Sequence, residues 1–402
     1  MKKKIIKFLR IISIVIIFTF SCEISKIASS AIIDHSNKAK IAQTKELSYE
    51  EFLEMNEKYP DNEFNGKIFF NIYGKKVYKD ETKLDLSDVK IDDNLDKKLQ
   101  MLERLTEVDL HNQDLSKARK EELLEEFPNI DFKWTVNVLD EEYENDVTSL
   151  DLSKKTIEDI DDLKSSIRLL TKLESIDFSY CNLSNEELGE LREEFPDIEI
   201  DWVVHLGKWS LRTDSIAFSV LIYRFDYRRM TSKDIEVLKY CTKLQALDLG
   251  HQDIVDISVI GEYLKDLRVL ILADNKIKDI SPIGELKHLH YLELFMNDIT
   301  DVTPLANCKE MVDLNISFNY HFSDLDGIWE YPLLERLWLV SDRIPESSYT
   351  KIKEVYPNVK LVRTGSGSTD SGWRTHERYY KMIDMFHKNY ISDVFTKFDD
   401  AV

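Results

Sequence analysis

Histidines at two places in this chain have a spacing that suits zinc. His376-Glu377 begins the pattern H-E-x-x-H, in which two histidines one helical turn apart bind the metal, but Tyr380 stands where the second histidine is required. His288 and His290 would lie on one side of a strand, yet no third ligand is evident in the sequence. We therefore predict no metal site and no cofactor.

Motifs for covalent or phosphoryl chemistry are also missing from the 402 residues. The chain contains neither G-x-x-x-x-G-K-[ST], which cradles phosphates, nor G-x-S-x-G, which presents a nucleophilic serine. No Cys-His-Asn or Ser-His-Asp set stands out over chance. We predict no catalytic residue and a non-enzymatic protein; a hydrolase without a motif would need a pocket of converging polar groups.

The charge of the chain narrows the class of partner. Its 75 acidic and 54 basic residues give a formal net charge of −21, and nucleic-acid binding requires a basic face instead. With 43% hydrophobic and 11% aromatic residues, the chain can bury a large core. We predict no nucleic-acid partner.

The first residues have the composition of an export signal. A basic start is followed by a largely apolar run of ten residues at 11–20, too short to span a bilayer, so residues 1–21 are predicted to be a signal peptide. The segment FTFSC resembles a bacterial lipoprotein processing site, which implies lipidation of Cys22 and a lipid anchor as the only membrane contact. Ordinary cleavage after Ser30 or Ala31, giving a secreted protein, and an uncleaved anchor are the alternatives. Removing residues 1–21 would leave 49 − 75, or −26.

The most informative pattern is a repeat over residues 241–345. Its first apolar positions are separated by 23, 22, 22 and 23 residues, and further apolar residues recur at +3 and +5 in each unit, with a polar residue at +8. This is the leucine-rich repeat, in which each unit supplies one short strand and the units stack into a curved parallel sheet. The first positions are Leu244, Leu267, Leu289, Met311 and Leu334.

A second signature follows each strand of this region. An Asp precedes an apolar residue at 256–257, 279–280, 301–302 and 324–325, and Pro282 and Pro304 complete I-x-D-I-x-P-L-like segments in two units. These residues resemble the internalin-type repeats of bacterial surface proteins. The resemblance implies protein recognition without identifying a partner.

Upstream, a longer period of 68 residues separates Tyr59-Pro60-Asp61, Phe127-Pro128-Asn129 and Phe195-Pro196-Asp197. Each follows a helix-like segment, two of which begin with capping boxes at Ser48 and Ser184. Further strands are expected where two apolar core residues are one residue apart, at 84/86, 108/110, 150/152, 176/178 and 216/218. A fourth helix end at Tyr356-Pro357-Asn358 closes the regular repeats.

These patterns predict an α/β fold: a leucine-rich-repeat solenoid with a curved parallel sheet, a helical or 3-10 convex side and a C-terminal helix. After the signal, we expect a flexible segment at 22–45, an irregular array of 68-residue units at 46–240, regular repeats at 241–345, a cap at 346–363, a linker at 364–372 and a helix at 373–402.

Three cysteines besides Cys22 remain. Cys241 and Cys308 hold the same repeat position three units apart, roughly 14 Å when strands advance about 4.8 Å each, which is beyond disulfide reach. Cys181 lies at a position where this repeat accepts Asn or Cys. We predict three unpaired, buried thiols.

Side chains that flank the core positions of each strand point to the concave face. Several form an apolar and aromatic cluster with charges, which is typical of binding hot spots. The alternative is that the C-terminal helix or a loop covers them. The predicted ligand-binding residues are Val269, Ile271, Tyr291, Glu293, Phe295, Asp313, Arg336 and Trp338.

The central outward position also carries a column of acids. Carboxylates on adjacent strands repel each other, so a column favours cations or a basic partner unless the acids are simply hydrated. The column is Asp85, Asp109, Asp151, Asp177 and Asp248, with Ala217 between the last two.

The C-terminal segment is predicted to form a helix with one apolar stripe of Tyr379, Met382, Phe386 and Tyr390. The stripe either packs on the last repeats or docks a partner. The sequence thus favours a monomeric recognition protein that is lipid-anchored at the bacterial cell surface. Its concave face is expected to bind a protein or a glycan, and a protein ligand would be basic if the acids take part. The alternative is a structural component of the cell envelope that docks through this helix.

Overall fold

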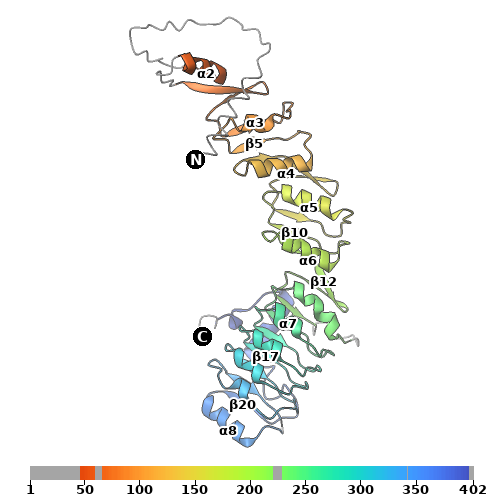
Figure 1. The fold of residues 1–402 in the computed structure, drawn as a ribbon. Coiled ribbons are helices and arrows are strands. Elements are labelled where there is room, and N and C mark those ends of the chain that lie inside the picture. Colours follow the sequence, from red (N-terminus) through yellow and green to blue (C-terminus); the bar gives the residue numbers. More distant parts are fainter. Residues whose placement is uncertain (1–45, 59–65, 221–228, 342, 398–402) are drawn as a thin grey trace, which may run out of the picture. The chain divides into compact units, whose positions relative to one another are not determined.

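The computed structural model describes residues 46–58, 66–220, 229–341 and 343–397. Cys22 and the predicted signal peptide lie outside the described residues. The chain divides into two compact units, Met1–Gln113 with Glu126–Phe132 and Asp114–Glu125 with Lys133–Val402. Figure 1 shows both as rows of short strands with helices beside them. Among the described residues, no helix has the length and apolar character needed to cross a membrane.

The first unit holds two small sheets. In one, β1 (Glu46–Ser48) pairs in parallel with β2 (Lys67–Ile72), which forms a hairpin with β3 (Lys75–Tyr78). The other is β4 (Lys83–Asp85), β5 (Glu107–Asp109) and β6 (Asp131–Lys133), with α3 (Leu95–Leu99) between the first two strands. The predicted capping box starts α2 (Tyr49–Lys58): the Glu51 amide donates to Ser48 Oγ at 3.1 Å, and the Ser48 amide to Glu51 Oε2 at 2.8 Å.

The second unit begins with helices and strands of the same kind. Strands β9 (Ser149–Asp151), β10 (Ser175–Asp177) and β11 (Glu199–Asp201) form a parallel sheet. Helices α4 (Lys117–Glu126), α5 (Ile160–Leu169) and α6 (Asn185–Glu194) accompany it, and α6 begins at the predicted capping box of Ser184 and Glu187.

Hairpins account for much of the 68-residue period. After the second and third aromatic-Pro-Asx motifs the chain forms β7 (Thr135–Val138) with β8 (Glu141–Glu144), and β12 (Val203–Leu206) with β13 (Trp209–Arg212). The return strands β8 and β13 were not predicted from the sequence. The turn at Leu139 and Asp140 has φ of 50° and 65° without a glycine, so the usual hairpin signal is missing there.

The regular repeats form one seven-stranded parallel sheet, β14 to β20 in chain order, and Figure 1 shows its strands stacked in one row. Ridges of α7 (Ser258–Tyr263) and the 3-10 helices η1 (Ser232–Tyr240), η2 (Ser281–Glu285), η3 (Thr303–Asn307) and η4 (Asp326–Ile328) form its convex side. The strands are β14 (Ala217–Ser219), β15 (Ala246–Asp248), β16 (Val269–Ile271), β17 (Tyr291–Glu293), β18 (Asp313–Asn315), β19 (Arg336–Trp338) and β20 (Lys360–Val362).

One strand differs from the expected register. Phe218 pairs with Leu247 and Ser219 with Asp248, so the core pair of β14 is Phe218 and Val220. The prediction of Ile216 with Phe218, and hence of Ala217 at the central outward position, was wrong. The offset is two residues, so Ala217 stays on the outward face, paired with Ala246, and Ser219 takes the central outward place, paired with Asp248.

The polar residue at +8 ties each repeat to its neighbour. Asn297 Nδ2 donates to the carbonyls of Leu272 at 2.9 Å and Leu294 at 3.0 Å, and its Oδ1 accepts from the Ile277 amide at 3.0 Å. Asn275 makes the equivalent bonds one repeat earlier. These bonds satisfy backbone groups that leave the sheet inside a buried loop.

The end of the row is closed by regular elements. Helix α8 (Glu346–Val355) leads into β20, which pairs with β19. Tyr356, at the predicted helix end, donates its hydroxyl to the Ile328 carbonyl. The expected cap at 346–363 therefore consists of α8 and β20.

Burial of the cysteines is confirmed for two of three. Cys241 and Cys308 are buried and unpaired, and burial raises the pKa of each thiol to about 12. Cys181 is unpaired as predicted but only half-buried, and burial raises its pKa less.

Candidate functional site: the covered concave face

The seven-stranded sheet brings the eight predicted ligand-binding residues onto one face. Register pairs Val269 with Tyr291, Tyr291 with Asp313, and Asp313 with Arg336 in one column. The neighbouring column contains Ile271, Glu293 and Trp338, and Phe295 follows β17. The spacing of the repeats thus predicted the composition of this face.

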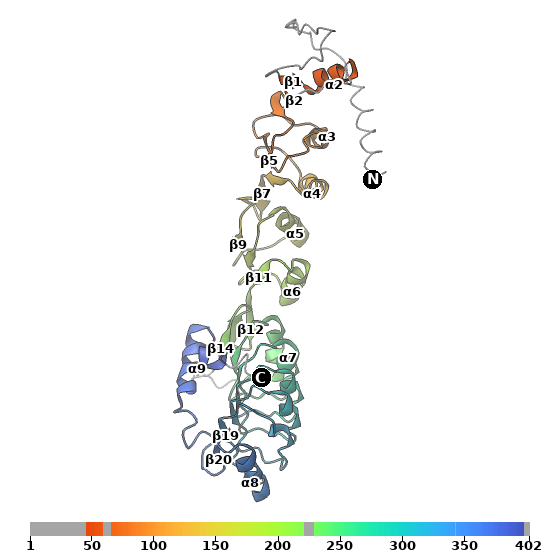
Figure 2. The same ribbon diagram turned by 90° about the vertical axis from the view of Figure 1, so that its left-hand side faces the viewer.

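The same face is covered by the chain's own C-terminal segment. Trp373, helix α9 (Glu377–Lys388) and the 3-10 turn η5 (Asp393–Phe395) pack against it, and Figure 2 shows α9 and α7 on opposite sides of the strands. None of the eight residues is more than 3% exposed. In this structure they do not form the open surface that we expected; the alternative, coverage by the C-terminal helix, is what the structure has.

The apolar stripe of the segment supplies the physical reason. Met382 and Phe386 are buried in one cluster with Val269, Ile271 and Phe295, while Tyr379 and Tyr390 pack at its margin. Burying a side chain of this size contributes roughly 1.5–3 kcal/mol before the entropy of ordering is subtracted. The stripe is therefore not free to dock another protein in this arrangement.

A fully buried carboxylate joins the sheet to the helix. Asp313 accepts two hydrogen bonds from Arg336, at 2.7 and 2.6 Å, and two from Arg378 of α9, both at 2.7 Å. Burial alone would raise the pKa of Asp313, but the hydrogen bonds and charges of the two arginines lower it below its usual range. Arg378 also contacts Glu335 at 2.6 Å, so two carboxylates face two guanidinium groups.

A second buried acid receives the tryptophan of the segment. The indole of Trp373 donates to Glu293 Oε1 at 2.6 Å, and the Tyr291 hydroxyl donates to the same oxygen. Burial and the nearby Glu293 charge raise the pKa of Tyr291 well above its ordinary value. The Trp373 ring lies 5.3 Å from that of Tyr291 and 5.0 Å from that of Trp338.

Further bonds join the sheet to the backbone of the segment. Trp338 Nε1 donates to the Asp370 carbonyl at 2.8 Å, and Asn315 Nδ2 donates to the Ser368 carbonyl at 2.9 Å. At the other end, Asn389 Oδ1 accepts from the amides of Ile216 and Ala217 at 2.8 and 3.0 Å. The contacts therefore extend from β14 to β19.

The acidic column is not continuous. Asp85 pairs in register with Asp109 in the first unit, and Asp151 with Asp177 in the second, whereas Asp248 belongs to the separate seven-stranded sheet. A column running through all five residues is therefore not what the structure contains.

Each acid of the column has a local partner. The carboxylate accepts a bond from the backbone amide two residues later, at 2.8–3.0 Å in the five cases: Ser87 to Asp85, His111 to Asp109, Ser153 to Asp151, Ser179 to Asp177 and Gly250 to Asp248. Among the described residues, no group of three or more His, Cys, Asp or Glu side chains is placed to hold a metal ion. The recurring Asp at this position therefore has a structural reason.

The histidines have structural partners. His376 is the N-cap of α9, where its ring accepts from the Arg378 amide at 3.2 Å. Both remaining histidines lie near the Glu310 carboxylate: His288 Nδ1 is 3.2 Å from Oε1, and His290 Nε2 is 3.7 Å from Oε2.

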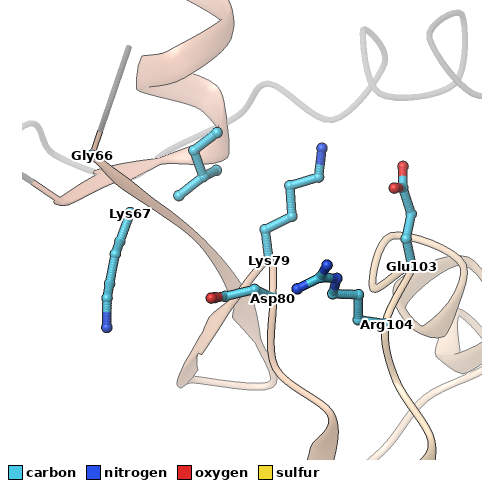
Figure 3. A pocket seen from close by; sticks show the side chains of 7 residues that line it. Gly66, Lys67, Lys79, Asp80, Glu103 and Arg104 are labelled. Atoms are coloured by element: carbon cyan, nitrogen blue, oxygen red, sulfur yellow. The ribbon is translucent and has the colours of Figure 1, made fainter.

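A small hollow of about 270 Å³ lies in the first unit, between Lys67, Lys79, Asp80, Glu103 and Arg104. Figure 3 shows that the ammonium groups of Lys67 and Lys79 point in opposite directions. The charges do not converge on one point, and we assign no ligand there.

Sequence reasoning missed Arg378 and Trp373. Arg378 lies one helical turn before Met382, on the apolar stripe, and a charged residue in that position signals a buried ion pair. Trp373 had no periodic signal because it precedes the helix.

The stacked strands, their asparagine ladder and the 3-10 ridges form a leucine-rich-repeat fold, which confirms the predicted fold class. Residues 265–307 match the family model described as "Leucine Rich repeats (2 copies)". A search of curated proteins gave no match.

Many solved structures are similar in fold. Internalin C2 of Listeria monocytogenes is 21% identical, with a TM-score of 0.32, covering 54% of this chain and 81% of that chain. The internalin InlF of the same species is also 21% identical, with a TM-score of 0.32, covering 73% and 71%. A leucine-rich-repeat protein of Leptospira interrogans is 17% identical, with a TM-score of 0.33, covering 66% and 74%. These similarities concern the fold alone.

Proposed function

We propose that this chain is a non-enzymatic recognition protein that acts outside the bacterial cell and binds a protein ligand through the concave face of its seven-stranded sheet. The observation that carries the proposal is that this face already holds polypeptide: residues 368–395 lie on it through ion pairs, aromatic contacts and hydrogen bonds to backbone carbonyls. Arg, Trp and Tyr are the residues most enriched where binding energy concentrates.

Export rests on the sequence of residues 1–21. We propose lipidation at Cys22 and a position on the cell surface, with a secreted form as the alternative. Expression in a bacterial host with labelled palmitate tests this: the full chain incorporates label and Cys22→Ala does not. Equal labelling of both, or of neither, removes the anchor from the proposal.

The uncovered acids suggest a basic ligand. Asp151 is exposed and bonds from Ser153 lower its pKa, so its carboxylate is anionic at neutral pH, whereas the half-buried Asp177 is paired with Arg212 at 2.7 Å. A glycan is the second ligand class, because acids and aromatic side chains also suit sugars.

The test uses the immobilised full chain with candidate host or envelope extracts, followed by purification of each captured protein and measurement of its affinity. We expect at least one purified protein to bind, and a peptide of residues 370–397 to compete with it. Asp151→Lys serves as a second variant, which weakens binding only if the ligand is basic. If no purified protein binds, or if only glycans do, protein recognition is overturned.

A further inference from the structure

The C-terminal segment has the anatomy of a bound ligand. We propose that the concave face is a peptide-binding site for a segment bearing a tryptophan and, five residues later, an arginine at a helix start, and that residues 370–395 are its intramolecular occupant. This inference rests on the proposed function and names the chemical class of its ligand.

Charge balance defines the arginine pocket. Asp313 and Arg336 lie on adjacent strands of the sheet and neutralise each other, while Glu335 adds a negative charge at the rim. The group of Asp313, Arg336 and Glu335 thus has one uncompensated carboxylate, and Arg378 supplies the missing positive charge. The Arg378 side chain is 7% exposed in that position.

The tryptophan pocket is equally specific. Tyr291 and Trp338 flank the Trp373 ring, and the Arg336 guanidinium lies 4.6 Å from its centroid. Glu293 provides the acceptor for the indole N–H, while its Oε2 makes no hydrogen bond and lies 3.8 Å from Arg374. Burying a carboxylate with one oxygen that makes no hydrogen bond costs desolvation free energy, and apolar residues of the same size would stabilise the core as well or better.

The segment is not required to close the repeat row, because α8 and β20 already do so. The segment joins β20 through residues 364–369, TGSGST, a composition typical of flexible linkers. A short linker gives an intramolecular ligand a millimolar effective concentration. A separate peptide must therefore compete with a tethered one.

The experiment uses the full chain with a protease site in residues 364–369, so that the segment remains bound after cleavage. A fluorescent peptide of residues 370–397 is added, and its uptake is followed by anisotropy while circular dichroism monitors the fold. We expect the peptide to exchange into a repeat domain that stays folded. Arg378→Gln in the peptide should weaken uptake by about 30-fold or more, because it leaves a buried charge unpaired.

Matched peptides sharpen the result. Lys388→Gln removes an exposed charge of the same helix, whose side chain is 66% exposed, and should leave uptake unchanged. Trp373→Phe keeps the ring but loses the indole donor, and uptake should weaken by about tenfold. Equal uptake of all four peptides overturns the assigned ligand class.

Two other outcomes also overturn the proposal. Unfolding of the repeats when the segment leaves shows that it is an integral part of the fold. Exchange of segments between intact copies, seen as a dimer by light scattering, makes a second copy the occupant. Neither outcome affects capture of a purified protein by other surfaces, so failure here is distinguishable from failure of the proposed function.

Discussion

Asp248 offers the sharpest test of the electrostatics of the covered face. It is fully buried, accepting from the Gly250 amide at 3.0 Å and from the Ser219 hydroxyl at 2.8 Å. Burial raises the pKa of Asp248 from 3.8 to about 6, against the opposing effect of these bonds. The folded state therefore holds this proton more tightly than the unfolded state, so stability falls as the pH rises from about 4 to about 6, and the penalty is constant above that range.

The size of the effect follows from the two pKa values. A difference of 6 − 3.8, about 2 pKa units at 1.36 kcal/mol each, makes the penalty about 3 kcal/mol at pH 8 and about 1 kcal/mol at pH 4.5. Asp248→Asn removes this charge, while its amide oxygen still accepts from Gly250 and its NH₂ donates to Ser219. We expect the variant to have a higher free energy of unfolding than the wild type at both pH values. This gain should be about 2 kcal/mol larger at pH 8 than at pH 4.5.

Urea unfolding followed by tryptophan fluorescence measures this difference, because the other titrating groups are common to both proteins. Asp151→Asn is the matched control: Asp151 accepts the same local amide bond but is exposed, and bonds from Ser153 lower its pKa. That substitution should give no gain that grows with pH. A pH-independent effect of Asp248→Asn, or a loss of stability at pH 8, would refute the reasoning.

Three further predictions concern the repeats. Asn297→Ala removes three buried hydrogen bonds and should lower the free energy of unfolding by about 3 kcal/mol. Asp298→Ala, at a half-exposed side chain 3.5 Å from His321, should change it by less than about 0.5 kcal/mol; urea unfolding measures both. Gly327→Ala places a Cβ 1.7 Å from a carbonyl oxygen of the neighbouring repeat, so we expect a lower melting temperature, and an unchanged one contradicts that close packing. In native protein at pH 8, iodoacetamide should modify Cys181 before Cys308, because burial raises the pKa of Cys308 to about 12. Mass spectrometry of samples taken over time measures the two rates, and equal rates would contradict this order.

The sequence predicted the repeats well because their information is local. A period of 22 or 23 residues, the apolar pair and the polar +8 position each act within one repeat or between neighbours, so the pattern is visible in one pass along the chain. The same reasoning placed Tyr291, Asp313 and Arg336 on one face. The register of β14 was wrong because Ile216, Phe218 and Val220 are all apolar, and alternation alone does not choose between the pairs 216/218 and 218/220.

The cover over this face was not predictable in the same way. Asp313 and Arg378 are 65 residues apart, and the docking of α9 depends on contacts with several strands at once. Sequence periodicity identifies an apolar stripe but does not identify what it faces. The missing hairpin signal at Leu139 had a different cause, a strained turn that carries no glycine.

The central outward position nevertheless contains a usable signal. In the sheet of β9, β10 and β11 this position holds Asp151, which is exposed, and Asp177, which is half-buried, and both are ionised. In the seven-stranded sheet, which the C-terminal segment covers, the same position holds residues of several types, including Ile271 and Trp338. An ionised group at a covered position loses hydration energy unless it has a partner. Two acids remain in the covered column: Glu293 accepts from the indole of the segment, and Asp248 accepts from the Ser219 hydroxyl. A change at this repeat position, from acids in one sheet to apolar and aromatic residues in another, therefore indicates where a repeat sheet binds something, whether a segment of its own chain or a ligand that replaces it.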